Sequence, residues 1–401
     1  MNVLDVSPRV VYPPWRGSVI RIYSLLRELS RRHEVRQFSQ VLGDFSFREL
    51  VEERALASTY REFRYAPPLA WLALEPGRRA CLGAPVLSGL ALRLARPALL
   101  GQLLAWADVA LVEFPWQFEH CRRHNQGARL VLSCHNVEAL KFGSWAQAAR
   151  RSIGSRWLRY IQMMEARAAA RADLVVTVSA ADREEMLGRY RLDPARVVLV
   201  PNGAEIREHL PATAQAREAA KLRLGLPDVP TVLYAASDIP PNRRGLDWIH
   251  EVAGCTDRFT FLVVGSVADE GSLGGHVVAA GSVDDIDPYL EAADMAICPI
   301  EHGGGTKIKL LEALGAGLPT VVFADALNGL GARDGAHVLV AEKSADGLLS
   351  ALNRLADQPE MAQVIGRSAR RLAAERYDWS VIARTLEGHL MRLTEDGPTT
   401  P

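Results

Sequence analysis

Short apolar runs alternate with longer helical patterns along the whole chain, and this alternation limits the fold more than any other feature. A chain of this kind forms parallel sheets covered by helices. Strands are predicted in the first half at residues 3–6, 35–38, 109–112, 130–132, 174–178 and 197–200, and in the second half at residues 231–234, 260–264, 277–279, 295–297, 320–323 and 338–340. The predicted fold class is therefore α/β, with two Rossmann-like domains.

The two predicted domains meet near the segment Pro201-Asn202-Gly203. We expect residues 1–205 to form the N-terminal domain and residues 206–379 the C-terminal domain, with a link over 204–230. The closing segment from Tyr377 carries aromatic and apolar residues that need a docking surface, so we expect a helix at 380–395 to return to the first domain. A length of 401 residues with 48% apolar content is enough for two buried cores.

The composition favours a soluble cytoplasmic protein. No apolar run reaches the roughly 18 residues of a membrane-spanning helix, and the N-terminus lacks the basic and apolar regions of a signal peptide. The cysteines have neither metal-ligand spacing nor the pattern of a disulfide framework; they are Cys81, Cys121, Cys134, Cys255 and Cys298.

The net charge of zero conceals an unequal distribution of charge along the chain. Residues 1–205 carry 29 Lys and Arg against 20 Asp and Glu, so the remainder is acidic by the same margin. A basic N-terminal half is expected to meet an anionic partner, which includes peripheral contact with the inner face of an anionic membrane. The alternative is that these arginines are solvated side chains on amphipathic helices.

A glycine-rich loop before a short helix is the strongest local signal of a binding site. Gly303, Gly304 and Gly305 allow a ligand to approach the backbone, and Thr306 is placed to cap a helix whose N-terminus favours an anion. Lys307 and Lys309 add positive charge there, although cations at a helix N-terminus oppose its dipole. The loop is thus predicted to bind nucleotide phosphates, and the alternative is a purely structural turn.

The loop also resembles a donor-binding block found in one branch of the retaining glycosyltransferases of family 4, which have the GT-B fold. Gly303-Gly-Gly-Thr-Lys-Ile-Lys-Leu-Leu-Glu312-Ala is similar to the family pattern G-x-G-T-[RK]-x-K-x-x-E-A. Two other segments resemble donor-side loops, Tyr234-Ala-Ala-Ser-Asp-Ile-Pro-Pro-Asn-Arg-Arg-Gly-Leu-Asp-Trp248 and Gly281-Ser-Val-Asp284. The resemblance implies two Rossmann-like domains whose parallel sheets face each other across a cleft.

The first half carries the resemblance as well, in motifs that follow the family's order along the chain. They are Tyr12-Pro-Pro-Trp-Arg-Gly17 with Arg21 in the following helix, Cys134-His-Asn-Val-Glu138, Ala172-Asp-Leu-Val-Val-Thr-Val-Ser179 and Val200-Pro-Asn-Gly203. Each motif alone is short, and their order makes the resemblance specific.

The resemblance implies a role for each candidate residue. His135 and Lys307 are the expected catalytic groups: His135 positions donor and acceptor, and Lys307 stabilises the leaving diphosphate. Glu312 is expected to accept hydrogen bonds from the ribose hydroxyls. The other expected donor-binding residues are Gly303, Gly304, Gly305, Thr306, Asn242, Arg243, Arg244, Ser282 and Glu301, and the acceptor or diphosphate loop contains Trp15, Arg16, Gly17 and Arg21.

The sequence departs from the family at the sugar-binding position. The wider family has a glutamate eight residues before Glu312, and this chain has Gly304 there. Glu301 or the backbone amides of the loop are the candidates to replace it. Asp285 and Asp287 form a D-x-D pair, the pattern that chelates a divalent metal ion in the other glycosyltransferase fold. In a chain with the GT-B pattern we expect them to be solvated or to cap a helix instead. Metal-independent transfer without a cofactor is therefore predicted.

The predicted function is retaining transfer of a hexose from a nucleotide-diphosphate sugar to an acceptor sugar, a lipid-linked sugar or a small molecule. No nucleic-acid partner is expected. Two alternatives remain open: an epimerase or hydrolase that acts on nucleotide-sugars with the same fold, and a non-catalytic subunit that only binds the nucleotide-sugar.

Overall fold

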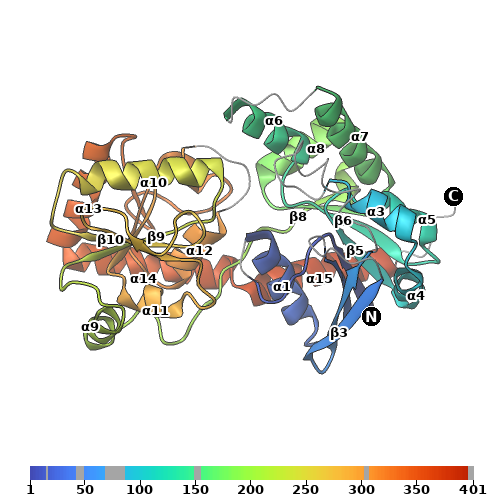
Figure 1. Ribbon diagram of the computed structural model, residues 1–401, viewed down its shortest axis with the longest axis horizontal. Coiled ribbons are helices and arrows are strands. Elements are labelled where there is room, and N and C mark those ends of the chain that lie inside the picture. Colours follow the sequence, from blue (N-terminus) through green and yellow to red (C-terminus); the bar gives the residue numbers. More distant parts are fainter. Residues whose placement is uncertain (15–16, 42–48, 68–85, 149–154, 302–306, 396–401) are drawn as a thin grey trace. The chain divides into compact units, whose positions relative to one another are not determined.

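The computed structural model describes residues 1–14, 17–41, 49–67, 86–148, 155–301 and 307–395 (Figure 1). The chain divides into two compact units. The N-terminal unit comprises Met1–Pro14, Ser18–Pro201 and Ile382–Pro401, and the C-terminal unit comprises Trp15–Gly17 and Asn202–Val381. The chain therefore leaves the first unit at Pro201 and re-enters it at Ile382.

The N-terminal unit is built on an eight-stranded sheet. Its strands, in spatial order, are β3 (Leu50–Ala57), β4 (Tyr60–Ala66), β2 (Glu34–Gln40), β1 (Asn2–Ser7), β5 (Val109–Glu113), β6 (Arg129–Ser133), β7 (Leu174–Thr177) and β8 (Val197–Leu199). All pairs are parallel except β3 with β4. The sequence patterns did not predict β3 and β4, so the sheet is mixed at this edge rather than fully parallel.

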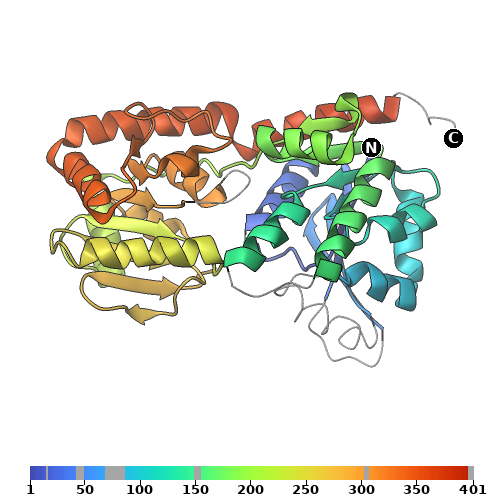
Figure 2. The same cartoon turned by 90° about the horizontal axis from the view of Figure 1, so that it is seen from above.

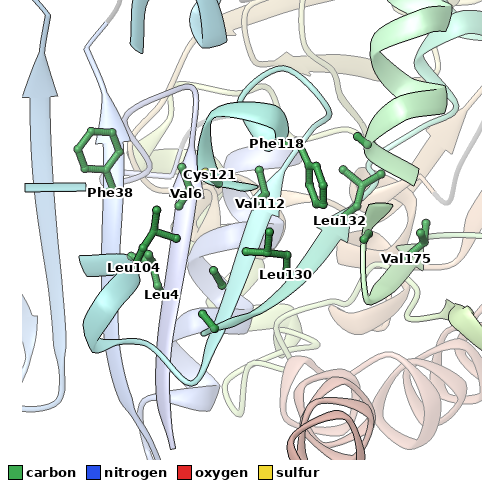
Figure 3. Close-up of a cluster of buried hydrophobic side chains, with 14 of the residues drawn as sticks. Leu4, Val6, Phe38, Leu104, Val112, Phe118, Cys121, Leu130, Leu132 and Val175 are labelled. Carbon is green, nitrogen blue, oxygen red and sulfur yellow. The ribbon is translucent and has the colours of Figure 1, made fainter. Parts of the chain in front are cut away.

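Helices cover the two faces of this sheet. They are α1 (Gly17–Leu29), α3 (Ser88–Ala95), α4 (Ala98–Trp106), α5 (Phe118–His124), α6 (Glu138–Ala148), α7 (Ser155–Arg171), α8 (Ala180–Tyr190) and the single turn η1 (Pro194–Arg196), with α15 (Trp379–Glu395) joining them from the end of the chain. One face packs against α3, α4, α5, α7 and α8 in a continuous apolar cluster (Figure 3). Strand side chains alternate between faces, so Leu4 and Val6 join this cluster while Asp5 faces away from it.

The second face of the N-terminal sheet packs against α1 and α15. Ile22 and Leu25 of α1 and Leu386 of α15 line one small cavity together with Leu111 of β5. Glu387 fixes α15 to the end of α1, because its carboxylate accepts hydrogen bonds from Arg32 at 2.9 Å and 2.6 Å. Figure 2 shows α15 as a red helix that runs to the end of the described chain.

The C-terminal unit has a seven-stranded sheet. Its strands, in spatial order, are β11 (Gly271–Ser272), β12 (Val277–Gly281), β10 (Thr260–Val264), β9 (Thr231–Ala235), β13 (Met295–Cys298), β14 (Thr320–Val322) and β15 (Leu339–Val340). The pairing is parallel except between β11 and β12. The two-residue β11 is another antiparallel edge strand that the sequence patterns did not predict.

Two apolar clusters show which helices cover each face of the C-terminal sheet. The helices are α9 (Ala214–Arg223), α10 (Pro240–Ala253), α11 (Asp287–Ala292), α12 (Ile308–Gly315), the turn η2 (Ala324–Leu327), α13 (Ala345–Asp357) and α14 (Pro359–Arg376). Val232 and Tyr234 of β9 pack with α10 and α13, whereas Leu233 between them packs with α9, α11 and α12. In Figure 1, α10 lies above this sheet and α9 and α11 lie below it. Helix α9 lies inside the segment 204–230 that we expected to be a plain link.

Local sequence sets where several helices begin. Ser179, Thr213 and Ser344 cap α8, α9 and α13, because each side-chain oxygen accepts a hydrogen bond from a backbone N–H in the first turn. Helices α10 and α14 instead begin with Pro240 and Pro359, whose fixed φ suits the first helical position. Among the described residues, no helix combines the length and the apolar character needed to cross a membrane.

Candidate functional site

In the centre of each sheet, two neighbouring strands are followed along the chain by strands added on opposite sides, and we call the place between these two strands the reversal point. Ligands of open α/β folds bind beyond the carboxyl ends of the strands at such a point. In the N-terminal unit the reversal lies between β1 and β5, and in the C-terminal unit between β9 and β13. Both reversal points have polar side chains at the carboxyl ends of their strands. We describe the two regions separately.

The reversal point of the N-terminal unit holds a buried acid–imidazole pair. Glu113 is the last residue of β5, and His135 follows the neighbouring strand β6. His135 Nε2 lies 2.5 Å from Glu113 Oε2, and the two side chains are each only 5% exposed. The predicted site residue His135 is therefore held by a carboxylate that the sequence prediction did not include.

Phe114 holds the imidazole from the side. Its ring stacks on His135 with a centroid distance of 4.4 Å and an interplanar angle of 20°. The backbone of Phe114 has φ of 69°, in the left-handed region that non-glycine residues seldom adopt. Strained residues of this kind cluster at functional sites, and here the strained residue is the one whose ring stacks on the imidazole.

Several groups around Glu113 favour its charged form. Burial opposes the charge, but His135, a hydrogen bond from Ser133 and the Arg21 guanidinium together lower the pKa of Glu113. The neighbouring Asp5 behaves in the opposite way: burial first, and then the negative charge of Glu113, raise its pKa well above the usual range. The surroundings thus move the pKa values of these two carboxyl groups in opposite directions.

Arg21, a member of the expected acceptor or diphosphate set, lies in the helix after the loop, as the resemblance placed it. It lies within α1 at 1% exposure and donates hydrogen bonds to the backbone oxygens of Val200 at 2.7 Å and Pro201 at 2.6 Å. Gly17 is the first residue of α1. The remaining two members of this set, Trp15 and Arg16, lie outside the described residues.

A second buried carboxylate supports the segment that carries His135. Glu165 of α7 accepts hydrogen bonds from the N–H groups of Glu138 at 2.7 Å and Ala139 at 3.1 Å, which open α6 directly after that segment. Tyr190 donates a third hydrogen bond at 2.6 Å. Burial nevertheless raises the pKa of Glu165 to about 7.

The reversal point of the C-terminal unit holds Glu301 next to α10. Glu301 follows β13, and its Oε1 accepts a hydrogen bond of 2.6 Å from the indole of Trp248. Arg244 stacks over the same indole at 4.2 Å, with its Nε 3.7 Å from Glu301 Oε1. This arrangement brings together two predicted donor-binding residues, Arg244 and Glu301, and adds Trp248, which the prediction did not assign to the site.

The turn between β9 and α10 contains Asn242 and Arg243. Asn242 donates its side-chain amide to the backbone oxygen of Ser237 at 2.8 Å, so it shapes the turn. Arg243 makes a two-point contact with Asp238 on the surface, where its side chain is 66% exposed. The α10 helix passes close to β9 at Gly245, where an added Cβ would lie 2.3 Å from the hydroxyl of Tyr234.

Lys307 and Glu312 flank the start of α12. The helix begins at Ile308, with Lys307 just before it, so the predicted cap at Thr306 is one residue too early. Glu312 is buried, and its Oε2 lies 3.0 Å from Lys309 Nζ. Lys309 and Glu312 line a small cavity with residues of β9 and β13. The predicted loop residues Gly303, Gly304, Gly305 and Thr306 lie outside the described residues.

The remaining predicted positions lie after β12. Ser282 is exposed directly after that strand. Asp285 accepts a hydrogen bond from the backbone N–H of Asp287 at 3.0 Å, and Asp287 forms an ion pair with Arg207. Both carboxylates of the D-x-D pair thus have protein partners, and within the described ranges no group of three or more His, Cys, Asp or Glu has the arrangement of a metal site.

The sequence prediction missed Asp5, Glu113 and Glu165. The first two had a visible signal, because each is an acid inside an otherwise apolar strand, in Asn2–Ser7 and Val109–Glu113. An acid at such a position is buried, and buried acids need partners. Glu165 had no comparable signal, since a glutamate in a helix of mixed charge is ordinary.

Comparison with known families assigns both halves of the chain. Residues 15–208 match the family described as Glycosyltransferase Family 4, and residues 229–358 match the family described as Glycosyl transferases group 1. The two matches together span most of the chain, and both families are glycosyltransferases. The matched segments contain Glu113 and His135 of the first reversal point and both strands of the second, β9 and β13.

Curated relatives of this glycosyltransferase chain are distant and longer than the region that matches. A D-inositol 3-phosphate glycosyltransferase from Kineococcus radiotolerans is 27% identical, with 64% of this chain and 65% of the relative covered. An MMP alpha-(1->4)-mannosyltransferase from Mycolicibacterium hassiacum is also 27% identical, over 59% of this chain and 58% of its own length. The match thus spans about three fifths of the length of these relatives.

Solved structures show that the chain has the GT-B fold. Sucrose-phosphate synthase from Thermosynechococcus elongatus superposes with a TM-score of 0.76 at 17% identity, covering 99% of this chain and all of the other. The HepE protein of Anabaena, solved with UDP and glucose, gives a TM-score of 0.68 at 14% identity, with 97% and 99% coverage. At these identities the likeness establishes the fold.

Proposed function

We propose that the protein is a retaining, metal-independent glycosyltransferase that moves a hexose from a nucleotide-diphosphate sugar to an acceptor. The observation that carries this proposal is that the two family matches include the polar residues at both reversal points, Glu113 and His135 in the first and Glu301 and Glu312 in the second. The names of the relatives, a glycosyltransferase acting on D-inositol 3-phosphate and a mannosyltransferase, agree with it. The UDP and glucose in the HepE structure support a nucleotide-sugar donor.

In this proposal the C-terminal unit binds the donor. Glu312 is buried and has only acceptor atoms, so the paired hydroxyls of a ribose are suitable partners, with Lys309 holding the carboxylate in place at 3.0 Å. Lys307 precedes the N-terminus of α12, where a cation and free N–H groups stabilise the charge that develops on a leaving diphosphate. Arg244 and Glu301 contact each other beside β13 and are assigned to the sugar end of the donor.

The N-terminal unit supplies His135 in this proposal. A retaining transfer on one face of the sugar, in which the leaving phosphate takes the acceptor proton, needs a group that orients donor and acceptor but no protein nucleophile. A buried imidazole held on three sides by Glu113, Phe114 and its own strand suits such an orienting role. The acceptor is then a sugar, a lipid-linked sugar or a small molecule.

The direct test starts with the donor. Thermal shift with a panel of nucleotide-diphosphate sugars identifies the one that raises the melting temperature most, because a ligand selective for the native state stabilises it in proportion to its affinity. Product analysis with that donor, with and without an acceptor extract and with EDTA present, then distinguishes transfer from hydrolysis and epimerisation. Free sugar or an isomerised nucleotide-sugar as the main product would overturn the proposal.

Variants test the residue assignments. Lys307→Ala is expected to lower turnover by about 100-fold or more, as for the loss of one group that stabilises a transition-state charge. Glu312→Gln is expected to weaken donor binding at least tenfold, while Glu375→Gln, an exposed glutamate on α14, serves as the matched control. Full donor-dependent activity in both Lys307→Ala and Glu312→Gln would refute these roles.

The basic N-terminal half supports a proposal about location: contact with an anionic surface from the cytoplasmic side. The charges available for this contact include Arg93, Arg96, Arg156 and Arg159, which are exposed on or next to α3 and α7. Sedimentation with vesicles rich in phosphatidylserine, compared with neutral phosphatidylcholine vesicles, tests it. Equal binding to the two kinds of vesicle would contradict an electrostatic contact.

A further inference from the structure

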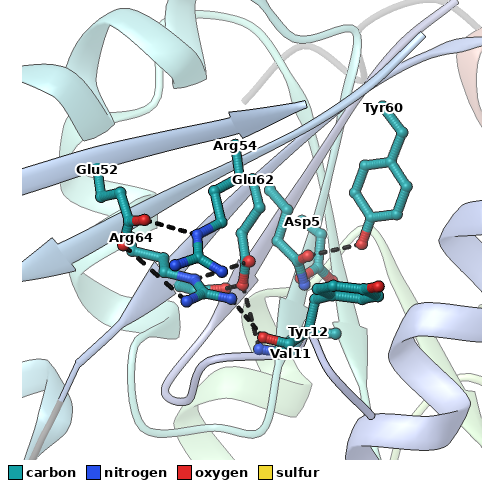
Figure 4. Close-up of polar contacts among 10 residues, drawn as sticks. Asp5, Val11, Tyr12, Glu52, Arg54, Tyr60, Glu62 and Arg64 are labelled. Carbon is teal, nitrogen blue, oxygen red and sulfur yellow. Dashed lines mark hydrogen bonds and ion pairs between the residues drawn. The ribbon is translucent and has the colours of Figure 1, made fainter. Parts of the chain in front are cut away.

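A row of buried polar side chains crosses the second face of the N-terminal sheet and ends at His135. It contains Tyr60, Gln37, Asp5 and Glu113, which lie on the neighbouring strands β4, β2, β1 and β5. Figure 4 shows Asp5 and Tyr60 of this row, next to the cluster formed by Glu62 and Arg64. An uninterrupted polar row on a buried face is costly unless every member has a partner.

From Tyr60 to Asp5, the hydrogen bonds of the row run in one direction. The hydroxyl of Tyr60 donates to Gln37 Oε1 at 2.6 Å, and Gln37 Nε2 donates to Asp5 Oδ1 at 3.0 Å. At the other end of the row, Glu113 Oε2 lies 2.5 Å from His135 Nε2. Glu113 thus stands between Asp5 and His135 in the row.

The link between Asp5 and Glu113 has a carboxyl group on each side. Asp5 Oδ2 is fully buried, and no donor among the described residues reaches it. Glu113 lies on the neighbouring strand β5, two residues beyond the Leu111 that pairs with Asp5, and therefore on the same face of the sheet. A hydrogen bond with Glu113 is among the causes that raise the pKa of Asp5. Two carboxylate oxygens are both acceptors, so such a hydrogen bond requires a proton on one of them.

The surroundings decide which carboxyl carries that proton. Glu113 faces His135, Ser133 and the Arg21 guanidinium, all of which favour an anion. Asp5 faces Gln37 and Glu113 and has no cation among its partners. The charged member is therefore Glu113, and the protonated member is Asp5.

We propose that Asp5 and Glu113 are positioning residues for His135: Asp5 is a neutral acid that donates its proton to the Glu113 carboxylate, and Glu113 accepts the Nε2 proton of His135. Which nitrogen of a histidine carries its proton is set by the hydrogen bond made by one of the two. With Nε2 committed to Glu113, Nδ1 makes no hydrogen bond to any described residue and is left for a ligand. That this ligand is the sugar rests on the proposed function; the proton arrangement does not.

Two spectroscopic measurements test the arrangement without any substrate. Infrared difference spectra of wild type against Asp5→Asn at neutral pH should show loss of the C=O stretch of a protonated carboxylic acid. Nitrogen-15 spectra of labelled histidine, with the His135 signal assigned by its loss in His135→Gln, should show a proton on Nε2. In Glu113→Leu that signature should change, because leucine has no acceptor for the Nε2 proton. Absence of the infrared loss, or a His135 signal that is the same in wild type and Glu113→Leu, would overturn the proposal.

Kinetics on the identified donor then separate positioning from packing. Asp5→Asn keeps an acceptor for Gln37 and a donor for Glu113, whereas Asp5→Leu keeps neither, so the Leu variant should lose at least tenfold more kcat than the Asn variant. Glu113→Gln should lose at least tenfold in kcat with little change in KM, and Glu184→Gln, an exposed glutamate on α8, is the control. Equal kcat values for Asp5→Asn and Asp5→Leu would overturn the role of Asp5. If the Leu variant does not fold, the infrared comparison on Asp5→Asn still decides the question.

Discussion

The two reversal points hold their polar side chains in different ways. In the N-terminal unit the Glu113–His135 pair is 5% exposed on both sides, and its neighbours in the sheet are buried as well. In the C-terminal unit the pairs at the corresponding ends are open to solvent, with Arg243 at 66% and Arg244 at 43% exposure. Buried charged groups lose much free energy when they lose a partner. Exposed ion pairs contribute little to stability, so a ligand can take the place of one partner at small cost in free energy. The first region is therefore preorganised, and the second can rearrange around what it binds.

The largest expected difference between the two regions comes from removing a cation from each of them. Arg21→Met leaves the oxygens of Val200 and Pro201 without a donor and removes a cation near Glu113, so the free energy of unfolding should fall by about 3–5 kcal/mol. The matched variant Arg243→Met, at an exposed pair, should cost less than about 1 kcal/mol. Urea denaturation measures both, and equal losses would show that burial does not separate the two regions.

The second prediction uses pH to test how tightly the His135 segment is held. Since burial raises the pKa of Glu165 to about 7 from its ordinary value of 4.5, the unfolded state releases this proton at lower pH than the native state does. The contribution of Glu165 to stability is therefore greatest below pH 4.5 and decreases by on the order of 3 kcal/mol as the pH rises to about 7. The difference in unfolding free energy between wild type and Glu165→Gln should follow this course.

Urea unfolding of wild type, Glu165→Gln and the control Glu184→Gln at several pH values provides the measurement. The control should differ from wild type by a nearly constant amount. A constant difference for Glu165→Gln as well would mean that this carboxyl titrates normally and that the His135 segment is less enclosed than described.

The third prediction concerns the packing of α10, which carries the exposed arginines. Gly245→Ala places a methyl group 2.3 Å from the Tyr234 hydroxyl, so we expect a loss of about 1–3 kcal/mol in unfolding free energy. Gly188→Ala on α8 meets no atom within 4 Å and should be neutral or stabilising by up to about 1 kcal/mol. If Gly245→Ala is equally harmless, the donor-side turn is loose in its backbone as well as in its side chains.

The smallest expected effect tests whether Arg243 contacts the donor. Asp238→Asn and Arg243→Gln both break the same surface pair, and each should change stability by less than about 1 kcal/mol. If Arg243 contacts the donor diphosphate, the two variants should differ in donor affinity: Arg243→Gln weakens it a few-fold, and Asp238→Asn leaves it equal or stronger. Isothermal titration with the donor decides, and identical affinities would remove Arg243 from the site.

Most of the fold was predictable because most interior strands, such as β5, β7, β10 and β13, consist largely of apolar residues. The exception is the edge of the N-terminal sheet. Leu50–Ala57 is almost wholly exposed and contains Glu52, Glu53 and Arg54, so it lacks the alternation that marks a strand. Tyr60–Ala66 hides its pattern because Glu62, a charged residue, is fully buried. Hydrophobic patterning cannot find a strand whose buried positions are polar.

The candidate site divides in the same way. His135 was predicted because a motif surrounds it, while Glu113 and Asp5 belong to no motif and act through tertiary contacts across three strands. Arg21 shows the converse case, since a motif placed it near a ligand and the helix buries it against the backbone of residues 200 and 201. Motifs indicate which residues approach a ligand, and the direction in which a helix presents a side chain needs the structure.

Because the chain leaves the N-terminal unit and later re-enters it, a simple truncation does not isolate this unit. Because the chain returns at Ile382, a gene fragment ending at Pro201 would encode an N-terminal half without the helix that covers Leu111 and Ile22 through Leu386. Arg32 and His33 would lose Glu387 at the same time. Adding residues 382–395 back as a separate peptide should restore the solubility of such a fragment, which makes this protein a candidate for a split reporter reassembled by its own final helix.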